Sequence, residues 1–209
     1  MRLGVFGGTF DPIHNGHLVA AEEVRARLNL DKVLFIPAGL PPHKLDHDIS
    51  PTRHRIAMLQ LAIAPNPGFG LSRVDVDRHG PCYTVETLSL LHQEYGPGTE
   101  LFFLMGMDSL AEILTWRDPE RLIRLARIVV VGRPGFQADV DELDTVLPGA
   151  KERIQVVDTP QLEISSSDIQ QRVREGLPIR YQVPEAVEAY IREHGLYAGH
   201  KSPSADFAD

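Results

Sequence analysis

The amino-acid sequence predicts an α/β fold: a doubly wound, mainly parallel sheet with helices on both faces and a small helical C-terminal part. Two features lead to this prediction. Short runs of β-branched and aromatic residues alternate with stretches whose apolar residues recur at helical spacing. The short runs are almost continuously apolar, which is typical of parallel strands covered on both faces. Sheets of this kind bind ligands outside the carboxyl ends of their strands.

The expected strands cover residues 3–6, 33–36, 71–76, 101–105, 128–131 and 154–157. The helix after the first strand carries apolar residues at positions 18, 21, 24 and 28, and Asn29 closes it. Ser50 is expected to cap a helix that ends near residue 64, and Thr84 is expected to cap another. Short helices are expected to start near Ser109 and Pro119. The C-terminal helices are expected over about 167–175 and 184–194.

The length and the end of the chain suggest its domain organisation. A chain of 209 residues fits one domain, which we place at residues 1–197. Residues 199–209 are small, polar and without periodicity, so we expect a flexible C-terminal tail over 198–209.

Charge and cysteine content narrow the class of protein. The formal net charge is −8, whereas a general nucleic-acid binder usually carries a basic excess. Cys82 is the only cysteine, so no internal disulfide is possible, which suits a reducing cytoplasm. We interpret Cys82 as a loop residue. No signal peptide or membrane span is recognisable. We therefore expect a soluble cytoplasmic protein with no nucleic-acid or membrane partner, and the oligomeric state stays open, a homo-oligomer included.

The segment after the first strand has the features of a phosphate-binding loop. Gly7-Gly8 allows a tight turn and close approach of a ligand, and Gly16 lies at the start of the following helix. The N-terminus of a helix presents free N–H groups to an anion. His14 and His17 flank this helix start, where imidazoles can donate to phosphate oxygens.

Other phosphate-binding and metal-binding motifs fit this loop less well. The Walker phosphate loop and the G-x-G-x-x-G fingerprint are both absent. Zinc fits less well, because the spacing is not H-E-x-x-H and no cysteine is near. The string Gly7-Gly8-Thr9-Phe10-Asp11-Pro12-Ile13-His14-Asn15-Gly16-His17 resembles the signature of the HxGH nucleotidyltransferase superfamily, which implies a Rossmann-like fold and a triphosphate ligand.

A second element precedes the helix expected near residue 167. The hydroxyls of Ser165, Ser166 and Ser167 either bind phosphate oxygens or cap the helix. The stretch resembles the Ile-Ser-Ser-Thr/Ser-x-x-Arg element of the same superfamily, but Gln170 stands where that pattern has arginine. Arginine would be a strong phosphate donor, so we expect Arg172 to substitute or Gln170 to make a neutral contact.

Further segments narrow the resemblance. They are Pro41-Pro42-His43-Lys44, Tyr83-Thr84-Val85-Glu86-Thr87-Leu88, Gly106-Met107-Asp108-Ser109, Trp116-Arg117, Arg133-Pro134-Gly135 and the stretch from Ile179 to Tyr197. Their order and spacing resemble the bacterial nicotinate-nucleotide adenylyltransferase family over residues 1–197. Glu86 is a departure, because the family often has aspartate there.

The resemblance implies adenylyl transfer from ATP to nicotinate mononucleotide in NAD biosynthesis. It implies catalytic roles for His14, His17 and Lys44. The ATP-binding residues would be Gly7, Gly8, Thr9, Phe10, His14, His17, Gly106, Asp108, Ser165, Ser166 and Arg172, and the mononucleotide-binding residues Lys44, Tyr83, Thr84, Trp116 and Arg133. We expect Mg²⁺ as a cofactor bound mainly through the ATP phosphates, with no dedicated protein metal site.

Alternatives to these roles stay open. Lys44 also fits a solvated surface lysine, Trp116 a packing residue, and Asp108 and Thr84 helix caps. Nicotinamide mononucleotide or phosphopantetheine would also fit the first loop as acceptors. A nucleotide-binding sensor without turnover and a nucleic-acid-binding module are alternatives of other classes.

Overall fold

The computed structural model describes residues 1–39, 49–78, 80–132, 140–160 and 162–198. Its centre is a six-stranded sheet in the order β3-β2-β1-β4-β5-β6. The strands are β1 (Arg2–Gly8), β2 (Lys32–Pro37), β3 (Phe69–Leu71), β4 (Glu100–Gly106), β5 (Arg127–Gly132) and β6 (Ile154–Asp158). Each pair of neighbouring strands is parallel. This order is that of the Rossmann fold and confirms the predicted fold class.

The strand order reverses between β1 and β4. Strands β2 and β3 lie on one side of β1, and strands β4, β5 and β6 lie on its other side. The carboxyl ends of β1 and β4 are Gly8 and Gly106. A ligand site is expected outside these ends.

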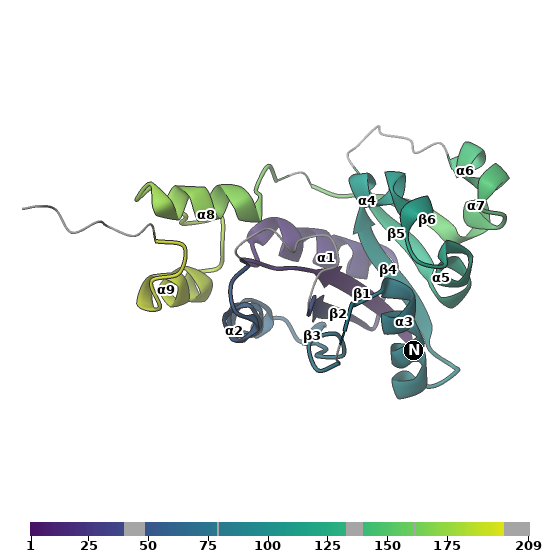
Figure 1. The fold of residues 1–209 in the computed structure, drawn as a ribbon, viewed down its shortest axis with the longest axis horizontal. Helices are drawn as coiled ribbons and strands as arrows, with labels where there is room; N and C mark the ends of the chain where they lie inside the picture. Colours follow the sequence, from purple (N-terminus) through teal and green to yellow (C-terminus); the bar gives the residue numbers. More distant parts are fainter. Residues whose placement is uncertain (40–48, 79, 133–139, 161, 199–209) are drawn as a thin grey trace, which may run out of the picture.

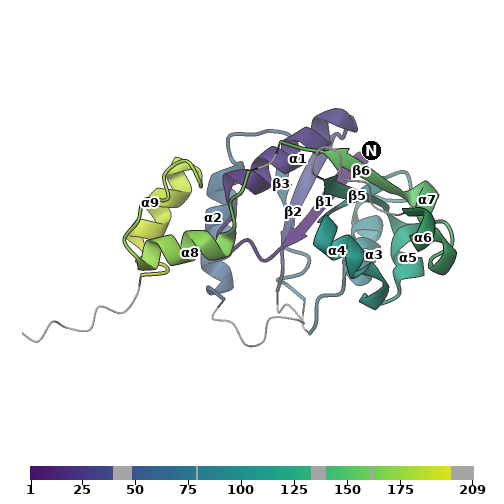
Figure 2. The same cartoon turned by 90° about the horizontal axis from the view of Figure 1, so that it is seen from above.

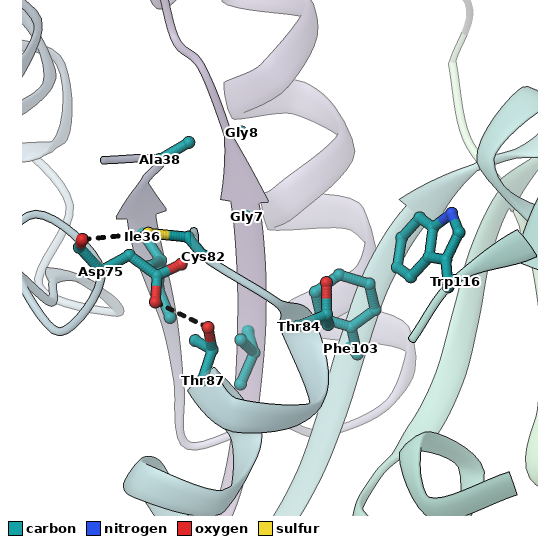
Figure 3. A pocket seen from close by; sticks show the side chains of 11 residues that line it. Gly7, Gly8, Ile36, Ala38, Asp75, Cys82, Thr84, Thr87, Phe103 and Trp116 are labelled. Atoms are coloured by element: carbon teal, nitrogen blue, oxygen red, sulfur yellow. Dashed lines mark hydrogen bonds between the residues drawn. The ribbon is translucent and has the colours of Figure 1, made fainter. Parts of the chain in front are cut away.

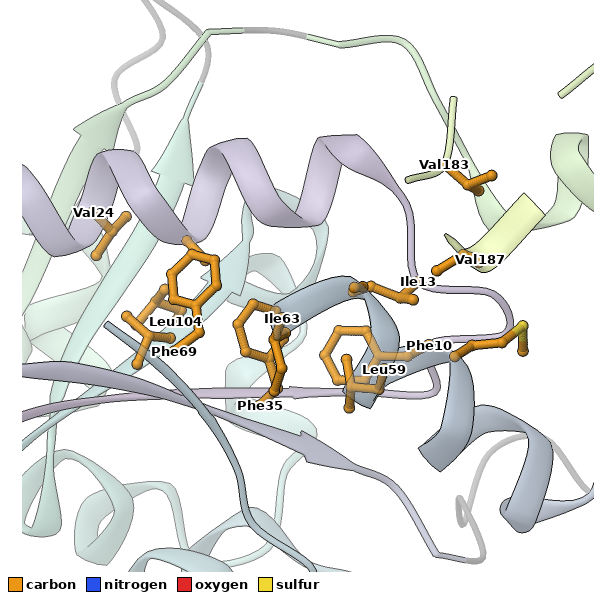
Figure 4. Close-up of a cluster of buried hydrophobic side chains, with 14 of the residues drawn as sticks. Phe10, Ile13, Val24, Phe35, Leu59, Ile63, Phe69, Leu104, Val183 and Val187 are labelled. Carbon is orange, nitrogen blue, oxygen red and sulfur yellow. The ribbon is translucent and has the colours of Figure 1, made fainter. Parts of the chain in front are cut away.

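One face of the sheet is covered by helices α1 (Asn15–Arg27) and α2 (Thr52–Ile63). Helices α8 (Ser166–Arg174) and α9 (Glu185–Glu193) contribute buried residues to the same core cluster. Figures 1 and 2 show α8 and α9 grouped beside α2 at one end of the molecule. Their buried side chains form one cluster with Val33, Phe35 and Phe102 of the sheet. Figure 4 shows this cluster, in which Phe10 and Ile13 of the first loop lie between the sheet and Val187 of α9.

The opposite face is covered by α3 (Thr84–Tyr95), α4 (Met107–Ala111), the 3-10 turn η1 (Ile113–Thr115), α5 (Pro119–Leu125) and α7 (Ala150–Arg153), with α6 (Val140–Val146) before α7. Leu88, Leu91 and Leu122 bury their side chains there against Leu3 and Val5 of β1. Because helices cover both faces, the central strands are apolar on both sides, as their continuous apolar runs predict.

Several boundaries differ from the expectations. The third strand is Phe69–Leu71 instead of 71–76, because the N–H groups of Val76 and Asp77 bond the carbonyl of Arg73 in a turn. Ser50 is no helix cap: its N–H donates to Asp11, and its carbonyl accepts from Arg55.

The expected cap at Thr84 is also wrong, because Thr84 is the first helical residue and Tyr83 precedes it as the cap. Helices α6 and α7 were not expected. The predicted tail falls outside the described residues except for Ala198. Among the helices that the structure describes, none is long and apolar enough to cross a membrane.

Candidate active site

The candidate site lies where the strand order reverses. A pocket of about 160 Å³ opens beside the carboxyl end of β1. Figure 3 shows Gly7 and Gly8 of β1 in the middle of the pocket, with Asp75 and Cys82 on one side and Thr84 and Trp116 on the other. Its remaining lining residues are Val5, Ile36, Ala38, Thr87 and Phe103. The pocket therefore brings together side chains from both sides of the switch point.

The first loop folds back over the end of β1. Phe10 has a left-handed backbone, with φ at 49°, and its ring is buried in the core. The ring lies over Gly8, where an added Cβ would come within 2.9 Å of Phe10 Cζ. Glycine at position 8 is therefore required by the packing of Phe10 inside the loop.

The two histidines of the loop are in direct contact. His14 is the cap residue of α1, and its N–H donates to Nδ1 of His17 at 3.3 Å. A neutral imidazole carries one proton, so this bond assigns the proton of His17 to Nε2. The Nδ1 atom of His14 is buried and has no hydrogen-bond partner among the described residues. The pair thus offers a donor on His17 and an unsatisfied polar atom on His14.

Gly16 makes room for this arrangement. A Cβ at position 16 would lie 3.0 Å from Nδ1 of His14, and the next nearest atom outside that ring is the carbonyl oxygen of Ile164, at 3.9 Å. Ile164 is the first residue of the second expected phosphate element, Ile164-Ser165-Ser166-Ser167. The glycine of the H-x-G-H string is therefore explained by the imidazole that must lie against it.

Burial keeps both imidazoles uncharged at neutral pH. It lowers the pKa of His14 to about 4. Burial, and next the proximity of His14, lower the pKa of His17 to about 3. The rings of Phe6 and Phe10 lie 5.9 Å and 5.1 Å from the ring of His17. A bound polyanion would raise both pKa values, because a nearby negative charge favours the protonated form.

The second phosphate element docks directly on the first loop. Ser166 Oγ donates to the carbonyl of Pro12 at 2.9 Å. Gln170 Nε2 donates to the carbonyl of Asp11 at 2.6 Å. The two motifs lie more than 150 residues apart in the chain, and α8 places them side by side. The departure at Gln170 is therefore a neutral contact to the loop.

Two expected phosphate ligands of this element are engaged elsewhere. Ser165 caps α8 and accepts a bond from the N–H of Asp168 at 3.0 Å, so its capping role is observed. Arg172 Nε and Nη2 both donate to the carbonyl of Pro178, at 3.0 Å and 2.8 Å. These bonds hold Arg172 to the chain beyond α8 and lend no support to its assignment as a triphosphate ligand, which stays a prediction.

Two of the expected mononucleotide residues, Thr84 and Trp116, line the side of the pocket opposite Asp75 and Cys82. The Trp116 ring is half-buried and meets Phe103 edge to face, with the centroids 6.0 Å apart. Tyr83 lies near Trp116, because the guanidinium of the next residue, Arg117, lies 4.5 Å from the centroid of the Tyr83 ring. Thr84 begins α3, so its N–H belongs to the first turn, where helical acceptors are missing.

The remaining assigned residues are placed as follows. Gly106 ends β4 and is the cap residue of α4, and Asp108 is exposed in the first turn of that helix. Both therefore lie at the carboxyl end of the strand next to β1. Lys44 and Arg133 fall outside the described residues.

Asp75 and Thr87 are pocket residues that the sequence analysis missed. Thr87 Oγ1 donates to Asp75 Oδ1 at 2.6 Å, and Arg78 lies 3.2 Å from the same oxygen. Burial raises the pKa of Asp75, while Thr87 and Arg78 act in the opposite direction. Asp75 was missed because its segment was expected to be a strand. Cys82 is a loop residue, as expected, and its Sγ donates to the Asp75 carbonyl at 3.2 Å.

Comparisons with known proteins agree with this geometry. A model of the cytidylyltransferase-like family matches residues 5–172. A probable nicotinate-nucleotide adenylyltransferase from Thermomicrobium roseum is 54% identical, covering 94% of this chain and 91% of its own. One from a Roseiflexus species is 52% identical, covering 93% and 97%. The nicotinic acid mononucleotide adenylyltransferase of Plasmodium falciparum complexed with NaAD shares the fold, with a TM-score of 0.74, 19% identity and coverage of 94% and 97%.

The chain belongs to the cytidylyltransferase-like family, whose match includes the first loop, the pocket and the start of α8. Within that family it groups with the nicotinate-nucleotide adenylyltransferases, since its relatives of that name match over more than nine-tenths of its length.

Proposed function

We propose that the protein transfers the adenylyl group of ATP to nicotinate mononucleotide, forming nicotinate adenine dinucleotide and pyrophosphate in NAD biosynthesis. The observation that carries this proposal is the docking of α8 on the histidine loop, beside a pocket that contains Trp116. That arrangement offers an anion site and an aromatic pocket at one switch point. The names of the relatives support the same substrates.

The chemistry needs positioning more than proton transfer. An oxygen of the mononucleotide phosphate forms the new bond to the α-phosphorus of ATP. The bond from that phosphorus to the bridging oxygen breaks, and its electron pair leaves with pyrophosphate. The second pKa of a phosphate monoester is about 6, so the nucleophile is already an anion at neutral pH. The protein must align two anions and stabilise the charge of the transition state.

His17 and His14 are proposed to act on the triphosphate. Nε2 of His17 carries the proton when Nδ1 accepts from the backbone, which suits donation to an α-phosphate oxygen. The buried Nδ1 of His14 would gain a partner if that ring turned or took up a proton beside the anion. Gly7, Gly8, Thr9 and Phe10 shape the loop around the phosphates.

The start of α8 is proposed to bind phosphate mainly through its backbone. The hydroxyls of Ser165 and Ser166 are engaged with Asp168 and Pro12. The N–H groups of Ser166 and Ser167 belong to the first turn of the helix, where they have no helical acceptor and can donate to an anion. Ser165 and Ser166 thus fix the helix start that contacts the triphosphate. Gly106 and Asp108 are proposed to contact the nucleoside part of ATP.

Trp116, Tyr83 and Thr84 are proposed to bind the mononucleotide. The half-buried indole can stack on a flat pyridine ring, and its edge-to-face contact with Phe103 holds it in place. The N–H of Thr84, at the start of α3, can donate to the ring carboxylate. Lys44 and Arg133 stay proposed mononucleotide-binding residues, and Lys44 stays a proposed catalytic residue.

Mg²⁺ is proposed to enter with ATP as the metal–nucleotide complex. The described residues contain no group of three His, Cys, Asp or Glu side chains that could hold a metal ion. The triphosphate can supply the oxygen ligands that Mg²⁺ prefers, with water completing its shell. The net charge of −8 and the single cysteine support a cytoplasmic setting without a nucleic-acid partner.

An acceptor panel tests the proposed activity. Pyrophosphate release would be followed with ATP and Mg²⁺ plus nicotinate mononucleotide, nicotinamide mononucleotide or phosphopantetheine in turn. Release is expected fastest with nicotinate mononucleotide. Faster release with another acceptor would change the substrate. ATP binding without release from any acceptor would indicate a sensor.

A further inference from the structure

A buried arginine in α2 bonds both the first loop and the start of its own helix. Arg55 is 1% exposed, although burial of a cation is costly unless hydrogen bonds compensate. Its Nη1 donates to the carbonyl of Thr9 at 2.9 Å and its Nε to the carbonyl of Ser50 at 3.1 Å. Its Nη2 bonds Thr52 Oγ1 at 3.1 Å. A side chain that only filled this space would be apolar, so the donors of Arg55 indicate a role in placing backbone.

Asp11 is the second member of this unit. It is 5% exposed, and its Oδ2 accepts a bond from the N–H of Ser50 at 2.9 Å. Its Oδ1 accepts from the hydroxyl of Tyr197. The negative charge of Asp11 raises the pKa of Arg55, against the larger lowering by burial. The carboxylate therefore connects the segment before α2 and the C-terminal segment to the loop.

Tyr197 reaches the loop from the far end of the chain. Helix α9 buries Val187 and Ile191 in the same core as Phe10. Gly195 and Tyr197 then take positive φ values of 58° and 63°, which turn the chain after the helix. Burial, and next the charge of Asp11, raise the pKa of the Tyr197 phenol, so that it stays a neutral donor at physiological pH.

These contacts fall on both neighbours of a strained residue. Phe10 has a left-handed backbone, which costs energy in a non-glycine residue and persists only where the surroundings impose it. Thr9, before it, is held by Arg55, and Asp11, after it, by Tyr197 and Ser50. The Phe10 ring in turn lies 5.1 Å from the ring of His17.

We propose that Arg55, Asp11 and Tyr197 form a buried positioning unit that fixes the conformation of the histidine loop for the triphosphate. In this account Tyr197 makes the C-terminal segment part of the catalytic framework without touching substrate. The inference rests on the proposed adenylyl transfer for its kinetic consequence, but the placement of the loop can be measured without turnover.

The Tyr197→Phe variant removes only the hydroxyl. Tyr190→Phe is the matched control, because Tyr190 lies in the same C-terminal part of the chain. The hydroxyl of Tyr190 bonds Nδ1 of His54 at 3.0 Å and makes no bond to the described residues of the loop. For Tyr197→Phe, kcat/KM for ATP is expected to fall on the order of 10- to 100-fold, since small misplacements near reacting groups have such effects. The KM for nicotinate mononucleotide should not change. The control should keep wild-type kinetics even if both variants melt at the same lower temperature.

Arg55→Lys keeps the positive charge but loses the planar fork of donors. It is expected to lose kcat/KM for ATP as Tyr197→Phe does. In ligand-free protein, the imidazole NMR signals of His17 should shift in Tyr197→Phe and Arg55→Lys but not in Tyr190→Phe. This readout tests the positioning unit even if the wild type does not turn over these substrates, which would refute only the proposed function. Unshifted His17 signals, or equal kinetic losses in Tyr197→Phe and Tyr190→Phe, would overturn the proposal.

Discussion

The imidazole rings of His14 and His17 are stacked at the start of α1, with their centroids 3.7 Å apart and their planes inclined by 28°. Stacking is compatible with two neutral rings, whereas two imidazolium ions at this distance would repel each other. The ligand-free loop therefore holds its histidines uncharged, in contact, and next to the N-terminal N–H groups of the helix.

Replacement of His17 by alanine should reduce kcat by about 10²- to 10³-fold, as the loss of one transition-state donor does in other enzymes. The fold should persist, because His17 is half-buried at a helix start rather than in the core. Steady-state kinetics and circular dichroism check both statements. His54→Gln serves as the control, because the His54 ring bonds Tyr190 of α9. Near-normal turnover of His17→Ala would remove His17 from the mechanism.

The two histidines should make stability depend on pH. Their folded pKa values of about 4 and 3 lie below the ordinary value of 6.5, so the unfolded chain binds protons first as the pH falls. The free energy of unfolding should therefore decrease from about pH 6.5 down to pH 4. Urea unfolding at several pH values measures this. The His14→Gln/His17→Gln double variant should have a flatter profile in that window, and an unchanged slope would contradict the assignment.

Replacement of Trp116 by alanine should raise the KM for nicotinate mononucleotide roughly 3- to 10-fold, which corresponds to the energy of one aromatic pair. The KM for ATP should not move, since Trp116 lies on the α3 side of the pocket. Trp116→Phe should recover part of the affinity, because a smaller ring can still stack. Unchanged affinity for the mononucleotide in Trp116→Ala would refute the stacking role.

Gln170 provides a test of how the two phosphate elements are joined. Gln170→Ala deletes the hydrogen bond to the Asp11 carbonyl. The free energy of unfolding is expected to fall by about 1 kcal/mol, the typical contribution of one hydrogen bond. The KM for ATP should rise with it. Gln171→Ala is the matched control, because Gln171 bonds the exposed Glu175 on the same helix. If both variants bind ATP alike, the contact from Gln170 to the loop has no functional weight.

The fold class was predictable from the sequence because its signal is local. Continuous apolar strands and amphipathic helices are visible in windows of about ten residues. The third strand was misplaced because Leu71–Val76 is apolar enough for a strand, while the turn held by Arg73 depends on hydrogen bonds that composition does not reveal. The predicted cap at Ser50 was wrong because contacts with Asp11 and Arg55 outweigh the local preference of serine for a cap. The predicted cap at Thr84 was wrong because the helix begins one residue earlier than expected.

Only part of the candidate site could be predicted from the sequence, again because local signals are the ones that a sequence reveals. Gly8, His14 and Gly16 stand in one short string, and the packing of Phe10 over Gly8 and His14 over Gly16 explains why glycine is needed there. Asp11, Arg55 and Tyr197 are separated by 44 and 142 residues along the chain and carry no shared motif. Only the packing of α9 against α2 and the core brings them together.

The central claim is most directly tested by following the α-phosphorus of ATP. Wild-type protein would be given ATP labelled at that phosphorus, with Mg²⁺ and nicotinate mononucleotide, and the products would be separated. The account predicts that the label appears in nicotinate adenine dinucleotide in equal amount to the pyrophosphate released, and that His17→Ala slows this transfer by about 10²-fold or more. Label that stays in ATP, or that enters no dinucleotide while pyrophosphate is released, would contradict it.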